Sequence, residues 1–161
     1  MNMLSDKENK LEVIETFFDE VWSKENKKAI WELFVPEEEG SKTAAGLRKE
    51  EKMGPEDFEG FHTTLLSLIQ EVKITVDHSV IDNDWISARC TLHAKSKKTN
   101  EPVTITGSAM ARITDGKIRQ AYNYFDFLHL FEGLGQLPQD TMKILMEGGE
   151  IAGSTPNLTT P

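Results

Sequence analysis

The side chains with the greatest capacity for chemistry lie close together near the end of the last strand-like segment. Asp126 carries a carboxylate, and Tyr122 and Tyr124 carry phenols. Gln120 adds an amide. Because successive side chains of a strand point to opposite faces, Ile118 and these even-numbered residues are expected to share one face. If that face looks into a hollow, all four polar groups meet a bound molecule.

This set of groups suits general acid–base chemistry. A single carboxylate can remove a proton from carbon and deliver one to oxygen when an apolar wall raises its pKa toward the working pH. Phe17, Trp22 and Phe61 are the candidate residues for that wall, and together with Gln120 they are the predicted substrate-binding residues. Either phenol would donate a hydrogen bond to a developing enolate oxygen.

Asp126 has two further interpretations that the sequence leaves open. It directly precedes the apolar run Phe127–Phe131, where an aspartate would cap a helical turn. It would also serve as a polar pocket residue without chemistry. Elsewhere, His62 lies among apolar residues and is interpreted as a boundary histidine. Cys90 is interpreted as a small buried hydrophobe, and the histidines show no metal-ligand spacing, so no metal site is predicted.

The composition limits the class of protein and its partners. The chain of 161 residues has a formal charge of −9, which argues against binding to the phosphate backbone of nucleic acids. Its single cysteine rules out an intrachain disulfide. The polar N-terminal segment does not have the pattern expected of a signal peptide, and no segment has the ~18 consecutive apolar residues of a membrane span. We therefore expect a cytoplasmic protein that binds neither nucleic acid nor membrane.

The elements that must position these side chains follow from the spacing of the apolar residues. Spacings of three and four predict a helix over about Lys7–Lys24 and a second helix that ends at Pro36. A third helix is predicted to open at Pro55, with acidic residues in its first turn. The stretch Pro36–Gly54 has no dominant period and is interpreted as a long loop, a type that often serves as a lid.

After Glu71 the apolar period changes from 3.6 to 2, which predicts strands. Their approximate bounds are 73–81, 85–96, 102–114 and 117–126. Asp115-Gly116 predicts a two-residue type I′ turn between the last two. Helices followed by a meander indicate an α+β fold, with the helices on one face of an antiparallel sheet. One domain is expected over 1–138, and 139–161 is expected to be an extension with a weak helix over Thr141–Met146 and a mobile tail.

Four segments give the chain a resemblance to a known family. They read F-F-D-E-V-W-S-K-E-N-K-K-A-I-W-E-L-F-V-P from Phe17, D-W-I-S-A-R-C-T-L from Asp84, V-T-I-T-G-S-A-M-A-R-I-T-D-G-K-I-R-Q-A-Y-N-Y-F-D from Val103, and G-L-G-Q-L-P from Gly133. Over about residues 10–138 the sequence resembles the SnoaL-like branch of the NTF2-like superfamily. The resemblance implies a cone-shaped α+β barrel with a pocket between helices and concave sheet, and a homodimer formed through the sheet.

The resemblance also implies an activity and a residue that performs it. Catalytic members are polyketide cyclases that close a ring by an intramolecular aldol reaction without metal or organic cofactor. Asp126 matches the aspartate of the family pattern E-x-W-x-x-x-D, the position of their acid/base residue. The neighbouring positions depart from that pattern. The usual Glu, His, Trp and Asp are replaced by Gln120, Ala121, Tyr122 and Asn123.

Two functions remain open at this point. The first is a cofactor-independent cyclase, isomerase or hydrolase that acts on a small hydrophobic or polyketide-like molecule through Asp126, Tyr122 and Tyr124. The second is a non-catalytic ligand-binding or dimeric assembly module of the same fold. The neutral replacements favour the second function, whereas the retained Asp126 favours the first. The expected dimer surface is an exposed sheet face that carries Thr104, Thr106, Met110 and Arg112.

Overall fold

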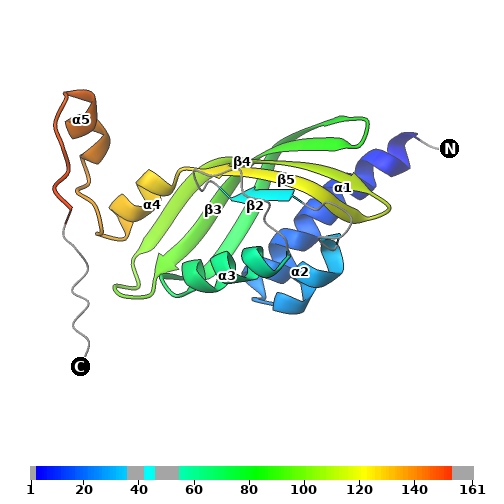
Figure 1. Cartoon of the computed structure of the whole chain (residues 1–161), viewed down its shortest axis with the longest axis horizontal. Helices are drawn as coiled ribbons and strands as arrows, with labels where there is room; N and C mark the ends of the chain where they lie inside the picture. The colour runs from blue at the N-terminus through cyan, green and yellow to red at the C-terminus, as the bar shows by residue number, and fades with distance from the viewer. Residues whose placement is uncertain (1–2, 36–41, 46–54, 154–161) are drawn as a thin grey trace.

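A computed structural model describes residues 3–35, 42–45 and 55–153, which form a helical layer and a sheet. The helices α1 (Met3–Phe17), α2 (Lys27–Leu33) and α3 (Pro55–Leu66) lie on the same side of a curved five-stranded sheet (Figure 1). The predicted α+β class, with helices packed on one face of the sheet, is therefore confirmed.

The first helix changes its winding near its C-terminal end. α1 passes directly into the π-helical segment η1 (Phe18–Ser23), where the Lys24 amide donates a hydrogen bond of 2.9 Å to the Asp19 carbonyl, five residues back. Such wide turns are rare in proteins, and those that occur often lie at functional sites. The buried side chains of this turn and its approach are Phe17, Phe18, Val21 and Trp22.

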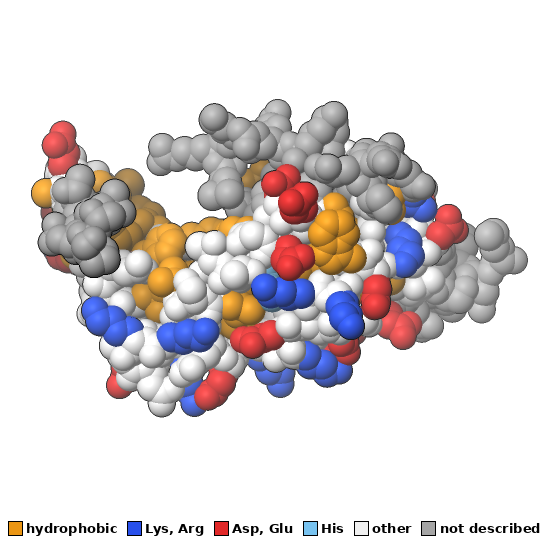
Figure 2. Space-filling model, turned by 60° about the horizontal axis from the view of Figure 1, so that its bottom comes forward, with side chains coloured by type: hydrophobic (Ala, Val, Ile, Leu, Met, Phe, Trp, Pro, Cys, Tyr) orange, Lys and Arg blue, Asp and Glu red, His pale blue; other side chains and the backbone are white. Residues whose placement is uncertain are grey.

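The third helix begins as its sequence predicts. Pro55 opens α3, and Glu56 and Asp57 occupy its first turn, where the helix dipole favours negative charge. The buried side of α3 includes Phe58 and Leu65. Figure 2 shows acidic and basic side chains interspersed over the helical side of the molecule, without a continuous basic patch among the described side chains in that view.

The sheet has the order β1-β5-β4-β3-β2, and every neighbouring pair is antiparallel except β1 with β5. Its strands are β1 (Lys42–Ala45), β2 (Ile69–Asp82), β3 (Trp85–Ser96), β4 (Pro102–Thr114) and β5 (Lys117–Phe125). The predicted meander is confirmed. Asp115 and Gly116 have φ values of 53° and 69°, as the type I′ turn requires. Within the described residues β1 and β2 are open edges, so the sheet is curved but unclosed.

A strand interrupts the segment that the sequence analysis interprets as one long loop. β1 pairs in parallel with β5, with Lys42 opposite Gln120 and Ala45 opposite Asn123. Four residues are too few to show an alternating pattern. A strand this short depends on pairing with its neighbour, which the sequence does not reveal. Residues 36–41 and 46–54 lie outside the described residues. The predicted end of the second helix at Pro36 and the proposed lid both concern these residues.

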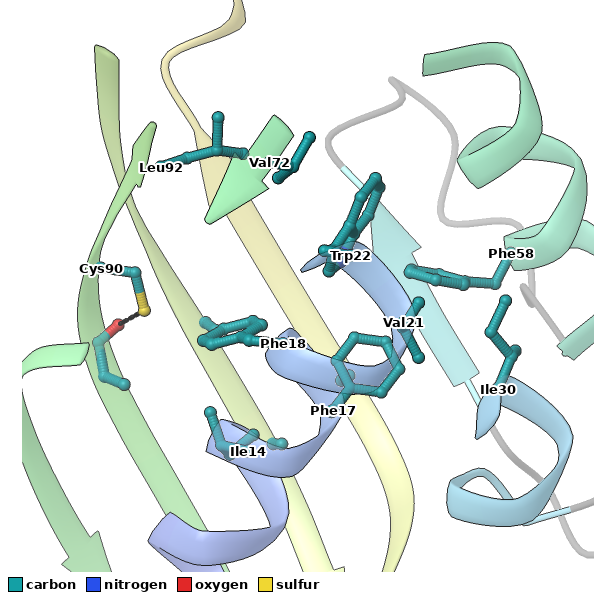
Figure 3. Close-up of a cluster of buried hydrophobic side chains, with 14 of the residues drawn as sticks. Ile14, Phe17, Phe18, Val21, Trp22, Ile30, Phe58, Val72, Cys90 and Leu92 are labelled. Carbon is teal, nitrogen blue, oxygen red and sulfur yellow. Dashed lines mark hydrogen bonds between the residues drawn. The ribbon is translucent and has the colours of Figure 1, made fainter. Parts of the chain in front are cut away.

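The two faces of the sheet differ in burial. Along β3 the even-numbered residues from Ile86 to Leu92 are buried toward the helices, and the odd-numbered residues point the other way. We call these the inner face and the outer face. Cys90 is fully buried on the inner face, which raises the pKa of its thiol to about 11 and confirms its interpretation as a small hydrophobe. Figure 3 shows Cys90 and Leu92 on the side of the sheet that holds Phe18 and Trp22.

Two short helices follow the sheet. α4 (Phe127–Gly133) packs on β4, where Gly133 approaches Val103 so closely that an added Cβ would lie 2.6 Å from its Cγ2. α5 (Thr141–Met146) stands at the end of the molecule away from α1 (Figure 1). The predicted helix is therefore present, whereas residues 154–161 of the predicted tail lie outside the described part. None of the described helices combines the length and apolar character needed to cross a membrane.

Candidate functional site

Five aromatic side chains and one leucine from the helical layer form one wall of a cavity. The contributors are Phe17, Phe18 and Trp22 from α1 and η1, and Phe58, Phe61 and Leu65 from α3. The ring of Trp22 meets its neighbours edge to face, with centroids 6.0 Å from Phe58 and 6.4 Å from Phe61. Edge-on contacts of this kind favour fixed relative orientations of the rings.

The sheet and the start of α4 supply the opposite wall. The lining is completed by Ile74, Leu92, Asn123, Phe125 and Phe127. Phe127 meets Phe61 edge-on across the cavity, with ring centroids 6.1 Å apart. The cavity measures about 40 Å³. Three of the residues predicted to bind substrate, Phe17, Trp22 and Phe61, thus lie in one wall, whereas Gln120 does not.

A β-bulge decides which side chains of β5 reach this cavity. The pairing of β4 with β5 slips by one residue, and Arg119 is the extra residue on β5. Ile118, before the bulge, is buried on the inner face, and after the bulge Ala121 and Asn123 take that face. The prediction that the even-numbered side chains share one face and point into the hollow is therefore wrong.

Gln120, Tyr122 and Tyr124 lie on the outer face instead. The Oε1 atom of Gln120 accepts a hydrogen bond of 3.0 Å from Nε of Arg112. Tyr122 stacks on Trp85, with centroids 6.3 Å apart and an interplanar angle of 19°. Tyr124 is 62% exposed. The sheet therefore separates both phenols and this amide from the cavity.

Asp126 precedes α4 and caps it. Its Oδ1 atom accepts a hydrogen bond of 3.0 Å from the backbone N–H of His129, and its own N–H donates to the Thr106 carbonyl at 3.0 Å. The residue is exposed, and it does not line the cavity although Phe125 and Phe127 on either side of it do. Among the interpretations left open by the sequence, the structure contains the hydrogen bond of the helix cap.

Asn123 is the candidate that sequence reasoning missed. It carries the single polar side chain among the described residues that line the cavity. Neither end of its amide has a hydrogen-bond partner within the described part of the chain. Its cross-strand neighbour, Ala109 of β4, offers only a methyl group. Because an amide both donates and accepts, Asn123 is the point at which a molecule in the cavity would make polar contact.

A buried histidine supports the helical wall from behind. The sequence analysis interprets His62 as a boundary residue, but the structure buries it fully. Its Nε2–H donates a hydrogen bond of 2.7 Å to the Val21 carbonyl. Its ring centroid is 4.8 Å from that of Trp22, and Nδ1 has no partner among the described residues. Burial lowers the pKa of His62 and favours the neutral ring.

The arrangement suits binding better than proton transfer. No titratable side chain of the described structure lines the cavity, and no group of three His, Cys, Asp or Glu in that part of the chain would hold a metal ion. A general acid or base must come within hydrogen-bond reach of the bound molecule. The cavity instead offers apolar contact and one amide.

Comparison with known proteins adds a family. Residues 12–134 match the model of the SnoaL-like polyketide cyclase family. No protein with a curated description matches the chain.

Several solved structures share the fold at low sequence identity. A candidate polyketide cyclase from Acidithiobacillus ferrooxidans has a TM-score of 0.68 at 16% identity, over 84% of this chain and 99% of its own. A candidate SnoaL-like polyketide cyclase from Jannaschia sp. CCS1 has 0.65 at 15%, over 81% and 94%. AclR, a candidate hydroxylase from Streptomyces galilaeus, has 0.65 at 17%, over 85% and 100%. The likeness supports the fold.

Proposed function

Because the chain belongs to the SnoaL-like polyketide cyclase family, we propose that it binds a small, predominantly apolar molecule in the cavity between helices and sheet. The composition of the wall carries this proposal. Of the eleven lining side chains in the described part of the chain, ten are apolar, and seven of those ten are aromatic. Ligand sites typically combine such apolar lining with a few polar groups that orient the ligand, and Asn123 is the polar group here.

In this proposal the molecule is held rather than converted. Proton transfer requires an acid or base in contact with the substrate. Asp126 is engaged in the α4 cap, and Tyr122 and Tyr124 lie on the outer face. A cyclase, isomerase or hydrolase reaction through Asp126 would need its carboxylate to leave the cap and turn inward. The non-catalytic function therefore ranks ahead of the catalytic one.

The size of the cavity sets a condition on binding. Its volume of about 40 Å³ is well below the roughly 300–1,000 Å³ of sites that bury drug-sized ligands. A ligand with one ring therefore has to displace wall side chains. The edge-on contact between Phe61 and Phe127 joins α3 to α4, and separating these two rings enlarges the space without breaking a hydrogen bond.

Trp22 provides a direct test because it lines the cavity. A variant with Trp31→Phe and Trp85→Phe keeps Trp22 as the sole tryptophan, and toluene should change its emission and raise the melting temperature. Leu65→Phe adds volume to the cavity wall and should abolish both effects. Leu66→Phe is the matched control, because Leu66 is buried outside the lining. Unchanged emission at saturating toluene would contradict the proposal.

We also propose that two copies pair through the outer face, in keeping with the homodimer expected from the sequence. The helices that pack on the sheet cover its inner face, and Val80, Met110 and Tyr124 on the outer face are 72%, 42% and 62% exposed. Exposed apolar groups that cluster on one face mark interaction sites. Sedimentation equilibrium should give the mass of two chains, and Met110→Glu should give one. A single-chain mass for the unaltered protein would contradict this pairing. The cytoplasmic location remains a prediction.

A further inference from the structure

We infer that the cavity selects neutral molecules that carry a carboxamide or lactam group, and that Asn123 recognises this group. The inference rests on the ligand binding proposed above and specifies the chemical class of the ligand. It depends on the place of one amide among ten apolar side chains.

The side chain of Asn123 is the part of the residue that remains available. Its backbone lies between two strands, opposite Ala109 of β4 and Ala45 of β1, so the sheet occupies its main-chain groups. Its Oδ1 is an acceptor and its Nδ2 a donor, and neither meets a partner in the described structure. The residue is half-buried, and neither amide atom is among the fully buried side-chain atoms that lack a partner. Asn123 therefore brings one acceptor and one donor to the cavity wall.

A carboxamide or lactam matches both groups at once. Its C=O and N–H lie in one plane, so it accepts from Nδ2 and donates to Oδ1 in a cyclic pair of hydrogen bonds. A ketone or an ether would fill only the donor of Asn123, and a hydrocarbon would fill neither. Asn123 is half-buried, so a ligand that covers its amide removes the amide from solvent, and the ligand that pairs both ends is preferred.

The rest of the wall favours a neutral ligand. Among the described residues, the other ten lining side chains carry no charge, so an ion would lose its hydration without meeting a counter-charge from them. The nearby core histidine, His62, has its Nε2–H directed to the Val21 carbonyl and not to the cavity. A carboxylate or an amidinium of the same shape as the carboxamide should therefore be rejected.

Benzamide, benzoate and benzamidine test this directly, because they differ in charge while keeping almost the same shape. Titrations use the variant with Trp22 as the sole tryptophan, and toluene is the apolar reference. Benzamide should bind at least about tenfold more tightly than either ion. Asn123→Leu, of similar size without hydrogen-bonding groups, should weaken benzamide by about tenfold and leave toluene unchanged or tighter. Asn123→Asp should shift the preference toward benzamidine.

The ranking of probes in the protein with Asn123 intact needs no cavity variant, so it decides the inference even if a variant fails to fold. Circular dichroism checks folding of both Asn123 variants. Equal affinities for the three polar probes, or tightest binding of an ion, would overturn the carboxamide preference and leave the apolar cavity standing. Equal weakening of benzamide and toluene in folded Asn123→Leu would do the same. Failure of toluene and benzamide alike to bind would overturn both this inference and the proposed function.

Discussion

Replacing Gly107 with alanine places a methyl group in space that β5 already fills. An ideal Cβ at Gly107 would lie 2.5 Å from the Tyr124 carbonyl oxygen and 2.6 Å from Cγ and Cδ1 of Phe125. Real Cβ atoms essentially never approach other heavy atoms within 3.0 Å. The carbonyl belongs to the backbone of the adjacent strand and does not swing aside as a side chain would. Either β4 and β5 separate locally or the ring of Phe125 turns.

We expect Gly107→Ala to lower the free energy of unfolding by about 1–3 kcal/mol, the usual range for added volume in a packed site. Because Phe125 lines the cavity, displacement of its ring should also weaken toluene binding. Gly60→Ala is the matched control. Gly60 lies within α3, and no atom lies within 4 Å of its ideal Cβ, so the same substitution should raise the free energy of unfolding by about 0.5–1 kcal/mol through helix propensity.

Urea denaturation followed by circular dichroism measures both changes, with midpoints compared at equal m-values. The two variants should move in opposite directions. A Gly107→Ala protein as stable as the original would contradict the packing of Phe125 over Gly107. It would also remove the support for the bulge at Arg119, which directs Asn123 to the inner face.

Three further predictions concern single side chains. Burial lowers the pKa of His62 below its usual 6.5, so below that pH the unfolded chain takes up a proton that the folded chain does not. As the pH is lowered below 6.5, the free energy of unfolding should therefore fall by up to about 1.4 kcal/mol per pH unit until the pKa of His62 in the folded chain is reached. Well above pH 6.5 it should not depend on the protonation of His62. Urea denaturation at several pH values should show that His62→Gln loses this slope and that His78→Gln, at an exposed residue, keeps it; equal slopes would contradict the burial. Asp126→Ala should remove the helix cap and lose about 1 kcal/mol of stability, whereas Asp126→Asn should keep the cap and that stability. Calorimetric titration should show unchanged toluene affinity in both variants. Weakened binding in the Asn variant would show that the carboxylate contacts the ligand. Cys90, with its thiol pKa raised to about 11, should react with an aromatic disulfide reagent only after unfolding in urea, and fast reaction of the folded chain would contradict its burial.

Local sequence patterns were sufficient for α3, for the four strands of the meander and for one turn. Asp115-Gly116 favours the I′ turn by itself, because that turn needs two positive φ values that these residue types tolerate. The stripe of α3 and the alternation of β3 each arise from one buried face of one element. All of these features depend on residues that are close together in the chain.

The register of β5 depends on residues far apart and was therefore not predictable by alternation alone. Arg119 has no property that marks a bulge. At one end of β5 the turn sets the pairing of Ile118 with β4. At the other end the contact between Gly107 and the ring of Phe125 sets it, and the extra residue allows both pairings. One trace is present in the sequence: the next inward residue after Ile118 is Ala121, three positions later instead of two.

Asp126 illustrates a different limit. Its place before an apolar run allows a cap, and its place after the predicted strand allows a pocket carboxylate. Residue type and position are the same in both cases, so only the hydrogen bond to the His129 amide distinguishes them. Asn123 was overlooked for a related reason, since an unbroken alternation assigns it to the face opposite the cavity.

The account depends on a small molecule lying between the helices and the inner face, beside Asn123 and away from the tyrosines. Crystals soaked in iodobenzene measure this most directly, because iodine gives an anomalous signal at its own position. We predict a peak in the space bounded by Trp22, Phe61 and Phe127. A peak on the outer face beside Tyr122, or no peak in the interior at saturating iodobenzene, would contradict the account.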